Sequence, residues 1–253
     1  MWNVGARVYG LGAIVIGVTG IVWGGLAAGG ISIPHAVPNR AIIADVASAV
    51  FIIGGVLINW PRLVRYGAVV LTTLFALDFV LLCVPPLVKH VTDFGYWDAS
   101  AEPVALGGAG LIAYAMSAKA LTPGLSSRLQ YIGRALFGIC LFSFGWAHFA
   151  YLDRTVSMVP PYIPPSQMFW AWFTALAAIA AGLAFISGVL ALPAARLLTL
   201  MYIIFQIFVH TPILMAGHTV FFNWAENAVN LALVGAAWVI ADSLAARKDV
   251  AAS

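Results

Sequence analysis

Residues 168–187 read MFWAWFTALAAIAAGLAFIS, twenty consecutive residues without an Asp, Glu, Lys or Arg. An α-helix of this length rises about 30 Å, which matches the hydrocarbon core of a bilayer. The stretch therefore predicts a transmembrane helix. A soluble protein can also bury one apolar helix, so the interpretation depends on whether the pattern recurs along the chain.

Seven more apolar runs of similar length occur in the 253 residues. The predicted spans are residues 5–28, 41–59, 64–85, 101–118, 131–151, 168–189, 194–215 and 224–244. Only 8% of the residues are Asp, Glu, Lys or Arg, against about 25% in soluble domains. So few charges cannot cover a water-exposed surface, and the sequence predicts an all-α integral membrane protein with eight transmembrane helices. The net charge is +3, and the basic residues are spread thinly over short loops, which argues against a nucleic-acid partner.

The second half of the chain repeats the first at a constant offset, the one that separates Arg7 from Arg134. The other matching pairs are Pro34 and Pro161, Pro38 and Pro165, Gly55 and Gly182, Pro85 and Pro212, and, after a small deletion, Glu102 and Glu226. Four spans return the chain to the same side, so we expect two parallel four-helix repeats. The expected units are residues 1–120 and 131–253, joined by a cytoplasmic linker at 121–130; the second ends in a short cytoplasmic tail.

The Lys and Arg residues predict the orientation. Nine lie at the termini and in the loops on the same side: Arg7, Arg62, Arg65, Lys119, Arg128, Arg134, Arg196, Arg247 and Lys248. The opposite side has only Arg40, Lys89 and Arg154. Positive residues concentrate on the cytoplasmic side, so we expect a multi-pass protein of a bacterial-type inner membrane with both termini in the cytoplasm. Among the acidic residues, only Asp242 and Asp249 fall in the inner half.

All five histidines fall on the predicted outer side, and Asp78 lies about 10 Å below the outer end of its span at 1.5 Å per residue. Ionisable residues within spans are costly and commonly functional. The candidates for catalysis or proton relay are His148, Asp153, Arg154 and His210, and those for ligand binding are Asp78, Tyr162, Trp170 and Glu226. We expect no metal site; His148, His210 and His218 are its weak candidates, because they lack a metal-binding spacing.

Structural roles compete with these functional ones. The spacing from Asn223 to Glu226 fits a capping box at a helix start, and Glu102 follows Ser100 at the start of the predicted span. Tyr162 and Trp170 could belong to an interfacial aromatic belt. Cys83 and Cys140 lie in apolar runs and form no C-x-x-C pair, so we expect two small buried side chains. The prolines of residues 160–165 predict a stiff extended loop.

Three elements resemble the DoxX-like membrane protein family in its tandem form. They are Gly145-Trp-Ala-His148-Phe149, Val159-Pro-Pro-Tyr-Ile-Pro164 and the helix that ends in Ala181-Gly182-Leu183, with weaker echoes at Gly20–Trp23, Val37–Pro38 and Gly54–Gly55. Members of the family take part in thiosulfate:quinone oxidoreduction and redox-stress complexes, and a distant relative is a cargo receptor. Many carry a Glu or His where Ala178 stands here, and this departure weakens the inference of a family-type catalytic centre.

The resemblance implies a redox-associated membrane subunit whose outward-facing polar pocket binds a small apolar ligand, with quinone as the possible cofactor. The alternative is a non-catalytic accessory or interaction subunit of a larger membrane complex, with membrane lipid and other membrane or redox subunits as partners. Small residues at 107–110 and 175–182 would let such a partner approach closely, although they could equally serve internal packing. A transporter is a third hypothesis, which Asp78 and the parallel repeats permit.

Overall fold

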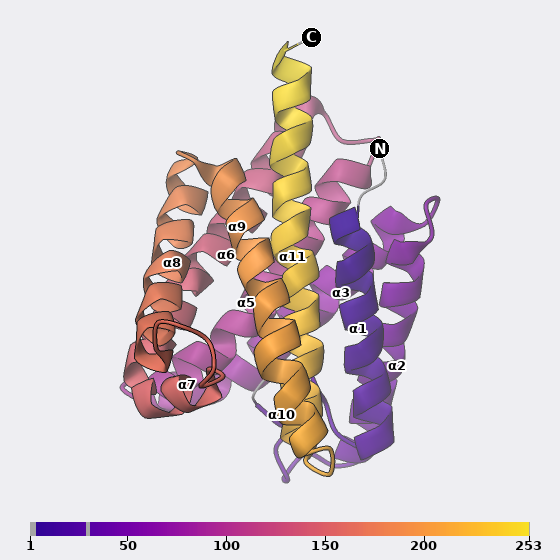
Figure 1. The fold of residues 1–253 in the computed structure, drawn as a ribbon. Coiled ribbons are helices and arrows are strands. Elements are labelled where there is room, and N and C mark those ends of the chain that lie inside the picture. Colours follow the sequence, from indigo (N-terminus) through magenta and orange to yellow (C-terminus); the bar gives the residue numbers. More distant parts are fainter. Residues whose placement is uncertain (1–3, 29–30, 253) are drawn as a thin grey trace.

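The computed structural model describes residues 4–28 and 31–252, and every regular element in these ranges is helical (Figure 1). The α-helices are α1 (Val4–Trp23), α2 (Arg40–Asn59), α3 (Val64–Asp78), α4 (Val84–Lys89), α5 (Phe94–Ser117), α6 (Pro123–Ala150), α7 (Leu152–Met158), α8 (Gln167–Ser187), α9 (Ala191–Phe205), α10 (Thr211–Ala216) and α11 (Phe221–Ala252). Two π-helical segments, η1 (Phe79–Cys83) and η2 (Gln206–His210), join α3 to α4 and α9 to α10. The side chains of Lys248 and Asp249 lie outside the described part.

Seven helices within the described ranges are long and apolar enough to cross a membrane, which confirms a multi-pass membrane protein. The remaining long helix, α5, has 24 residues and a length of about 36 Å at 1.5 Å per residue. It is less apolar because it carries Asp98 and Glu102 among many small residues. Since α5 packs against α3, α6 and α11, it has little need of a lipid-facing apolar surface. Both termini lie at the same end of the bundle (Figure 1), and we call this end the terminus side.

The eight long helical segments form one bundle in which the two halves interlock. Helix α1 packs mainly against α2 and α11, and α5 packs mainly against α3 and α6. The first and last helices of each half therefore contact the other half more than each other. Glycines allow close helix approach between the halves and within the second half. A Cβ added at Gly108 would lie 2.7 Å from the carbonyl oxygen of Gly133 across the halves, and one at Gly182 would lie 2.7 Å from that of Gly138 within the second half. The small-residue stretches at 107–110 and 175–182 thus serve packing within the chain.

Several helix bounds recur at the offset that relates Arg7 to Arg134. The starts and ends of α3, η1 and α4 match those of α9, η2 and α10, and the starts of α2 and α5 match those of α8 and α11. The equal spacing of the helix starts leaves no room for the deletion expected before Glu226. Glu102 and Glu226 are therefore three residues, or about one turn, out of register.

Three expected boundaries need correction. Helix α1 ends at Trp23 instead of residue 28, because the chain turns at Gly24, whose φ of 64° suits glycine. Helix α6 begins at Pro123, so most of the expected linker is helical; Thr122 caps it by accepting a hydrogen bond from the Leu125 N–H. The loop after His148 contains the short helix α7, and only Tyr151 and residues 159–166 are non-helical.

Candidate functional site

Four acidic side chains from three helices form a carboxyl cluster between the two halves of the bundle. The cluster consists of Asp78 on α3, Asp98 and Glu102 on α5, and Glu226 on α11. Glu102 interacts electrostatically with the other three, and Glu226 also interacts with Asp98. Asp98 and Glu102 are one turn apart on the same helix, which places their carboxyls on one face.

Two oxygen atoms of this cluster are buried without a hydrogen-bond partner in the described part of the chain, Oδ2 of Asp78 and Oε2 of Glu102. Asp78 is only 7% exposed as a residue. Buried polar atoms are hydrogen-bonded in the great majority of cases, so each exception calls for an explanation. These two oxygens are free to bond with a ligand.

The cluster descends from the side opposite the termini toward the middle of the bundle. At 1.5 Å per residue, Glu226 lies about 8 Å and Glu102 about 12 Å from the starts of their helices. Asp78 lies about 16 Å from Lys89, the end of α4, which is deeper than the sequence predicted because the helix continues past residue 85. In a hydrocarbon core of about 30 Å, the deepest carboxyl is thus near the midplane.

One cation and one hydroxyl act on the outer members of the cluster. Arg154 on α7 interacts electrostatically with Glu226, and its guanidinium carbon lies 5.5 Å from the centroid of the Phe222 ring. Ser143 on α6 donates a 3.3 Å hydrogen bond to Oδ1 of Asp98. Both partners belong to the second half, so the two halves contribute jointly to the site.

The capping roles expected for Glu102 and Glu226 are wrong. Helix α5 begins at Phe94 with Asp93 as its N-cap, whose side chain accepts a 2.9 Å hydrogen bond from the Gly95 N–H. Glu102 is therefore well inside the helix. Helix α11 begins at Phe221, before the proposed box, and Asn223 instead donates a 3.0 Å hydrogen bond to the carbonyl of Gly217.

The two cysteines are unpaired and buried, as predicted, and both lie close to the cluster. The thiol of Cys83 is hydrogen-bonded to Ser100 and interacts electrostatically with Asp78 and Glu102. The phenol of Tyr202, which is 6% exposed, interacts with Cys140 and Glu102. Thiol, hydroxyl and phenol groups therefore lie beside the carboxyls, and these are weaker hydrogen-bonding partners than charged side chains.

In the described part of the chain, no hydrogen bond or electrostatic interaction joins the histidine candidates to this cluster. The Nδ1 atom of His148 lies 2.8 Å from the Phe144 carbonyl, and since a carbonyl only accepts, Nδ1 carries the hydrogen and Nε2 is left open. The His148 ring packs on Phe205, with centroids 6.3 Å apart. His210 ends η2, and His218 is exposed in the following loop. Among the described residues, no three His, Cys, Asp or Glu side chains are grouped to hold a metal ion.

The other candidates lie at the surface. Tyr162 is 73% exposed, and Asp153 is exposed in the first turn of α7. The indole N–H of Trp170 donates a 2.8 Å hydrogen bond to the Pro164 carbonyl, and its ring packs edge-on against Phe173. Of the sequence-predicted site residues, the structure brings Asp78, Arg154 and Glu226 together.

Asp98 was missed by the sequence reasoning, and Glu102 was assigned to a helix start. Their signal was the spacing of four residues between two acids, followed by the small residues of 105–110, which mark a buried helix face. No sequence pattern indicated that Ser143, Tyr202 and Cys140 lie near these acids, because their positions depend on contacts between the two halves.

Comparison with known families supports the resemblance. The DoxX family model matches residues 129–211, from the first turns of α6 to the start of α10, which is about a third of the chain. No curated protein and no solved structure matches. The matched segment contains the histidine and proline elements on which the resemblance rested, including His148 and Pro160–Pro165. The chain is therefore a multi-pass membrane protein in which residues 129–211 match the DoxX family.

Proposed function

We propose that the protein is a redox-associated membrane subunit that binds a small apolar molecule of the quinone class at the carboxyl cluster. The observation that carries the proposal is the pair of buried, unpartnered oxygens on Asp78 and Glu102. A quinone has two carbonyl oxygens that accept hydrogen bonds, and an apolar body that suits a helix bundle. Protonated carboxyls and the Tyr202 phenol are suitable donors to such oxygens.

The depth of the carboxyls indicates the side from which the ligand reaches the cluster. They form a series from Glu226 near the helix start to Asp78 near the midplane, with Arg154 at the outer end. Large buried apolar side chains, Leu71, Phe75 and Ile112, fill the bundle further toward the terminus side. This arrangement favours a site reached from one side over a transport path.

Quinone titration tests the proposal. Nine tryptophans make quenching of intrinsic fluorescence by a short-chain benzoquinone a suitable readout for the protein in nanodiscs. We expect Glu102→Gln to weaken binding about tenfold, because the amide N–H is a weaker donor than the carboxyl O–H and a free energy of about one neutral hydrogen bond is lost. Asp153→Asn is the matched control, because Asp153 is an exposed acid on the same side. Equal affinity for wild type and Glu102→Gln would refute the site and favour the accessory-subunit hypothesis.

The tandem organisation and the orientation are part of the same proposal. The helix bounds that recur at one constant offset support two parallel units, 1–120 and 131–253, and a bundle with both termini on one side supports eight spans. The excess of Lys and Arg on the terminus side supports cytoplasmic termini in an inner membrane. The carboxyl cluster would then open to the outside.

Labelling of single cysteines in intact cells tests the orientation. In a Cys83→Ala, Cys140→Ala background, Tyr162→Cys should react with a membrane-impermeant maleimide, since Tyr162 is 73% exposed. Gly124→Cys, at an open position on the terminus side, should react only after the cells are lysed. The reverse pattern would place the carboxyl cluster toward the cytoplasm.

A further inference from the structure

A second polar region lies at the opposite end of the bundle, where the α2–α3 connection meets the end of α5. Two cavities of about 280 and 310 Å³ adjoin there and share Arg65 in their walls. The larger is lined by Arg62, Arg65 and Lys119, together with Pro61, Val64 and Ser117. Three cations thus converge on one cavity with no acidic residue in its lining.

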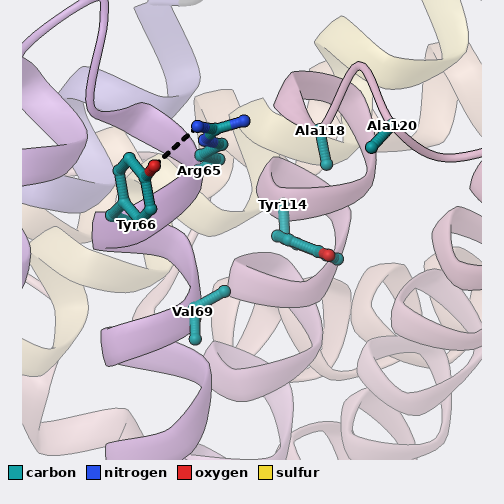
Figure 2. A pocket seen from close by; sticks show the side chains of 6 residues that line it. All are labelled: Arg65, Tyr66, Val69, Tyr114, Ala118 and Ala120. Carbon is teal, nitrogen blue, oxygen red and sulfur yellow. Dashed lines mark hydrogen bonds between the residues drawn. The ribbon is translucent and has the colours of Figure 1, made fainter.

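The three cations are available to a ligand. All three are exposed, and in the described part of the chain none forms an ion pair. Arg65 is held in place: its Nη2 donates a 2.6 Å hydrogen bond to the Tyr66 hydroxyl, and its guanidinium carbon lies 4.5 Å from that ring's centroid (Figure 2). This bond uses one of the five guanidinium donors and leaves the others free.

The start of α3 adds backbone donors to the same cavity. Val64 is the first residue of the helix and lines the cavity, and Leu63 at the N-cap supplies no side-chain hydrogen bond. The Tyr66 N–H already donates to the Leu63 carbonyl, whereas the N–H groups of Val64 and Arg65 have no backbone partner in the described part of the chain. Such unpaired N–H groups at a helix start favour an anion. Cationic side chains and a helix start therefore point to one kind of ligand group, a phosphate.

The smaller cavity indicates that the phosphate belongs to a lipid. Its walls include Val69, Tyr114, Ala118 and Ala120, a mainly apolar surface beside Arg65 (Figure 2). The continuous segment from Val64 to Lys89 has 26 residues and spans about 39 Å, so its ends reach the level of the headgroups. Val69, one turn below Arg65, is 46% exposed and can contact an acyl chain.

We propose that these cavities bind the phosphate of an anionic phospholipid on the terminus side of the membrane. Arg62, Arg65 and Lys119 hold the phosphate, and Tyr114 and Val69 line the path of an acyl chain. At the offset of the repeat, the three cations correspond to Val189, Leu192 and Ala246 in the second half, so the site belongs to the first half alone. It is separate from the carboxyl cluster, and its failure in a test leaves the proposed function untouched.

Native mass spectrometry of the full chain in detergent tests the site, with phosphatidylglycerol, phosphatidylcholine and inorganic phosphate as separate probes. We expect preferential retention of phosphatidylglycerol, weakened about a hundredfold in an Arg62→Gln, Arg65→Gln, Lys119→Gln variant, since each cation near an anionic surface contributes about a fivefold factor. The control variant Arg128→Gln, Arg196→Gln, Arg247→Gln removes the same charge from exposed positions on the same side outside the cavities.

Three results would overturn the proposal. Equal loss of phosphatidylglycerol in both variants would show general surface attraction, equal binding of phosphatidylcholine would show no role for the cations, and displacement of the lipid by millimolar phosphate would assign the site to free phosphate. If the triple variant does not fold, the single variants Arg62→Gln and Lys119→Gln decide the question, each with an expected loss of about fivefold.

Discussion

The segments α3–η1–α4 and α9–η2–α10 share a backbone and differ in chemistry. Each has a π-helical segment followed by a proline, Pro85 or Pro212, at the second position of the next helix. In each, the first N–H after the π segment bonds five residues back, from Val84 to Phe79 and from Thr211 to Gln206. Because proline cannot donate the next helical hydrogen bond, it marks the place where the helix widens in both halves.

The side chains on these two backbones are unlike. Asp78, the last residue of α3, corresponds to Phe205, the last residue of α9. The second half also has Asn230, whose amide donates a 2.7 Å hydrogen bond to Gln206, so the polar groups there satisfy one another. In the first half, Asp78 has an oxygen without a partner. The helix bounds of these two segments thus match, whereas a buried acidic oxygen without a partner occurs, among the described residues of the two segments, only in the first.

The substitution with the largest expected effect tests whether the two halves pack closely through α1 and α11. At Gly235 a Cβ would meet the backbone of Tyr9, so Gly235→Leu should separate α1 from α11 and destabilise the protein by more than about 3 kcal/mol. Gly124→Leu is the control, because nothing lies within 4 Å of a Cβ there. Size-exclusion chromatography should show loss of the monodisperse peak for Gly235→Leu alone. A stable Gly235→Leu protein would mean that the halves pack more loosely than the structure shows.

Substitutions at positions 78 and 205, which correspond at the constant offset, have the next largest expected effect. Phe205→Asp places a carboxyl in a span that has no site for it. We expect the free energy of unfolding to fall by about 3 kcal/mol, which a lower midpoint of thermal unfolding would detect. Phe205→Leu serves as its control for lost packing. Asp78→Asn should leave stability unchanged or raised, because the amide keeps the shape of a group that has no bond to lose at Oδ2. Strong destabilisation by Asp78→Asn would instead assign Asp78 a structural role.

Much of this fold could be predicted from the sequence, because bilayer thickness imposes a length and an apolar composition that single runs display directly. Seven of the eight expected spans correspond to candidate spans in the described ranges. The predicted ends of two spans were wrong, since the helix that carries Asp78 continues through the Pro pair at 85–86 and α1 ends early at a glycine turn.

The site was predicted only in part. Asp78, Arg154 and Glu226 could be identified singly, since charge inside or beside a span is rare. That Asp98 and Glu102 join them depends on α5 lying between α3, α6 and α11, an arrangement of helices that no local pattern contains. The same holds for Ser143, whose hydrogen bond to Asp98 crosses between the halves.

The substitutions with the smallest expected effect test whether the loops before α5 and α11 are held by the same kind of tryptophan hydrogen bond. The indole N–H of Trp97 donates a 2.9 Å hydrogen bond to the Val91 carbonyl, and that of Trp224 donates a 2.8 Å bond to the His218 carbonyl, both six residues back. Each bond lies at the surface, so Trp97→Phe and Trp224→Phe should each cost about 0.5–1 kcal/mol in thermal unfolding, with values that agree within about 0.5 kcal/mol. Trp172→Phe is the control for lost ring area, since the described residues contain no partner for the Trp172 indole N–H. A large cost at one tryptophan and none at the other would show that the loops before α5 and α11 differ although the two helix starts match at the constant offset.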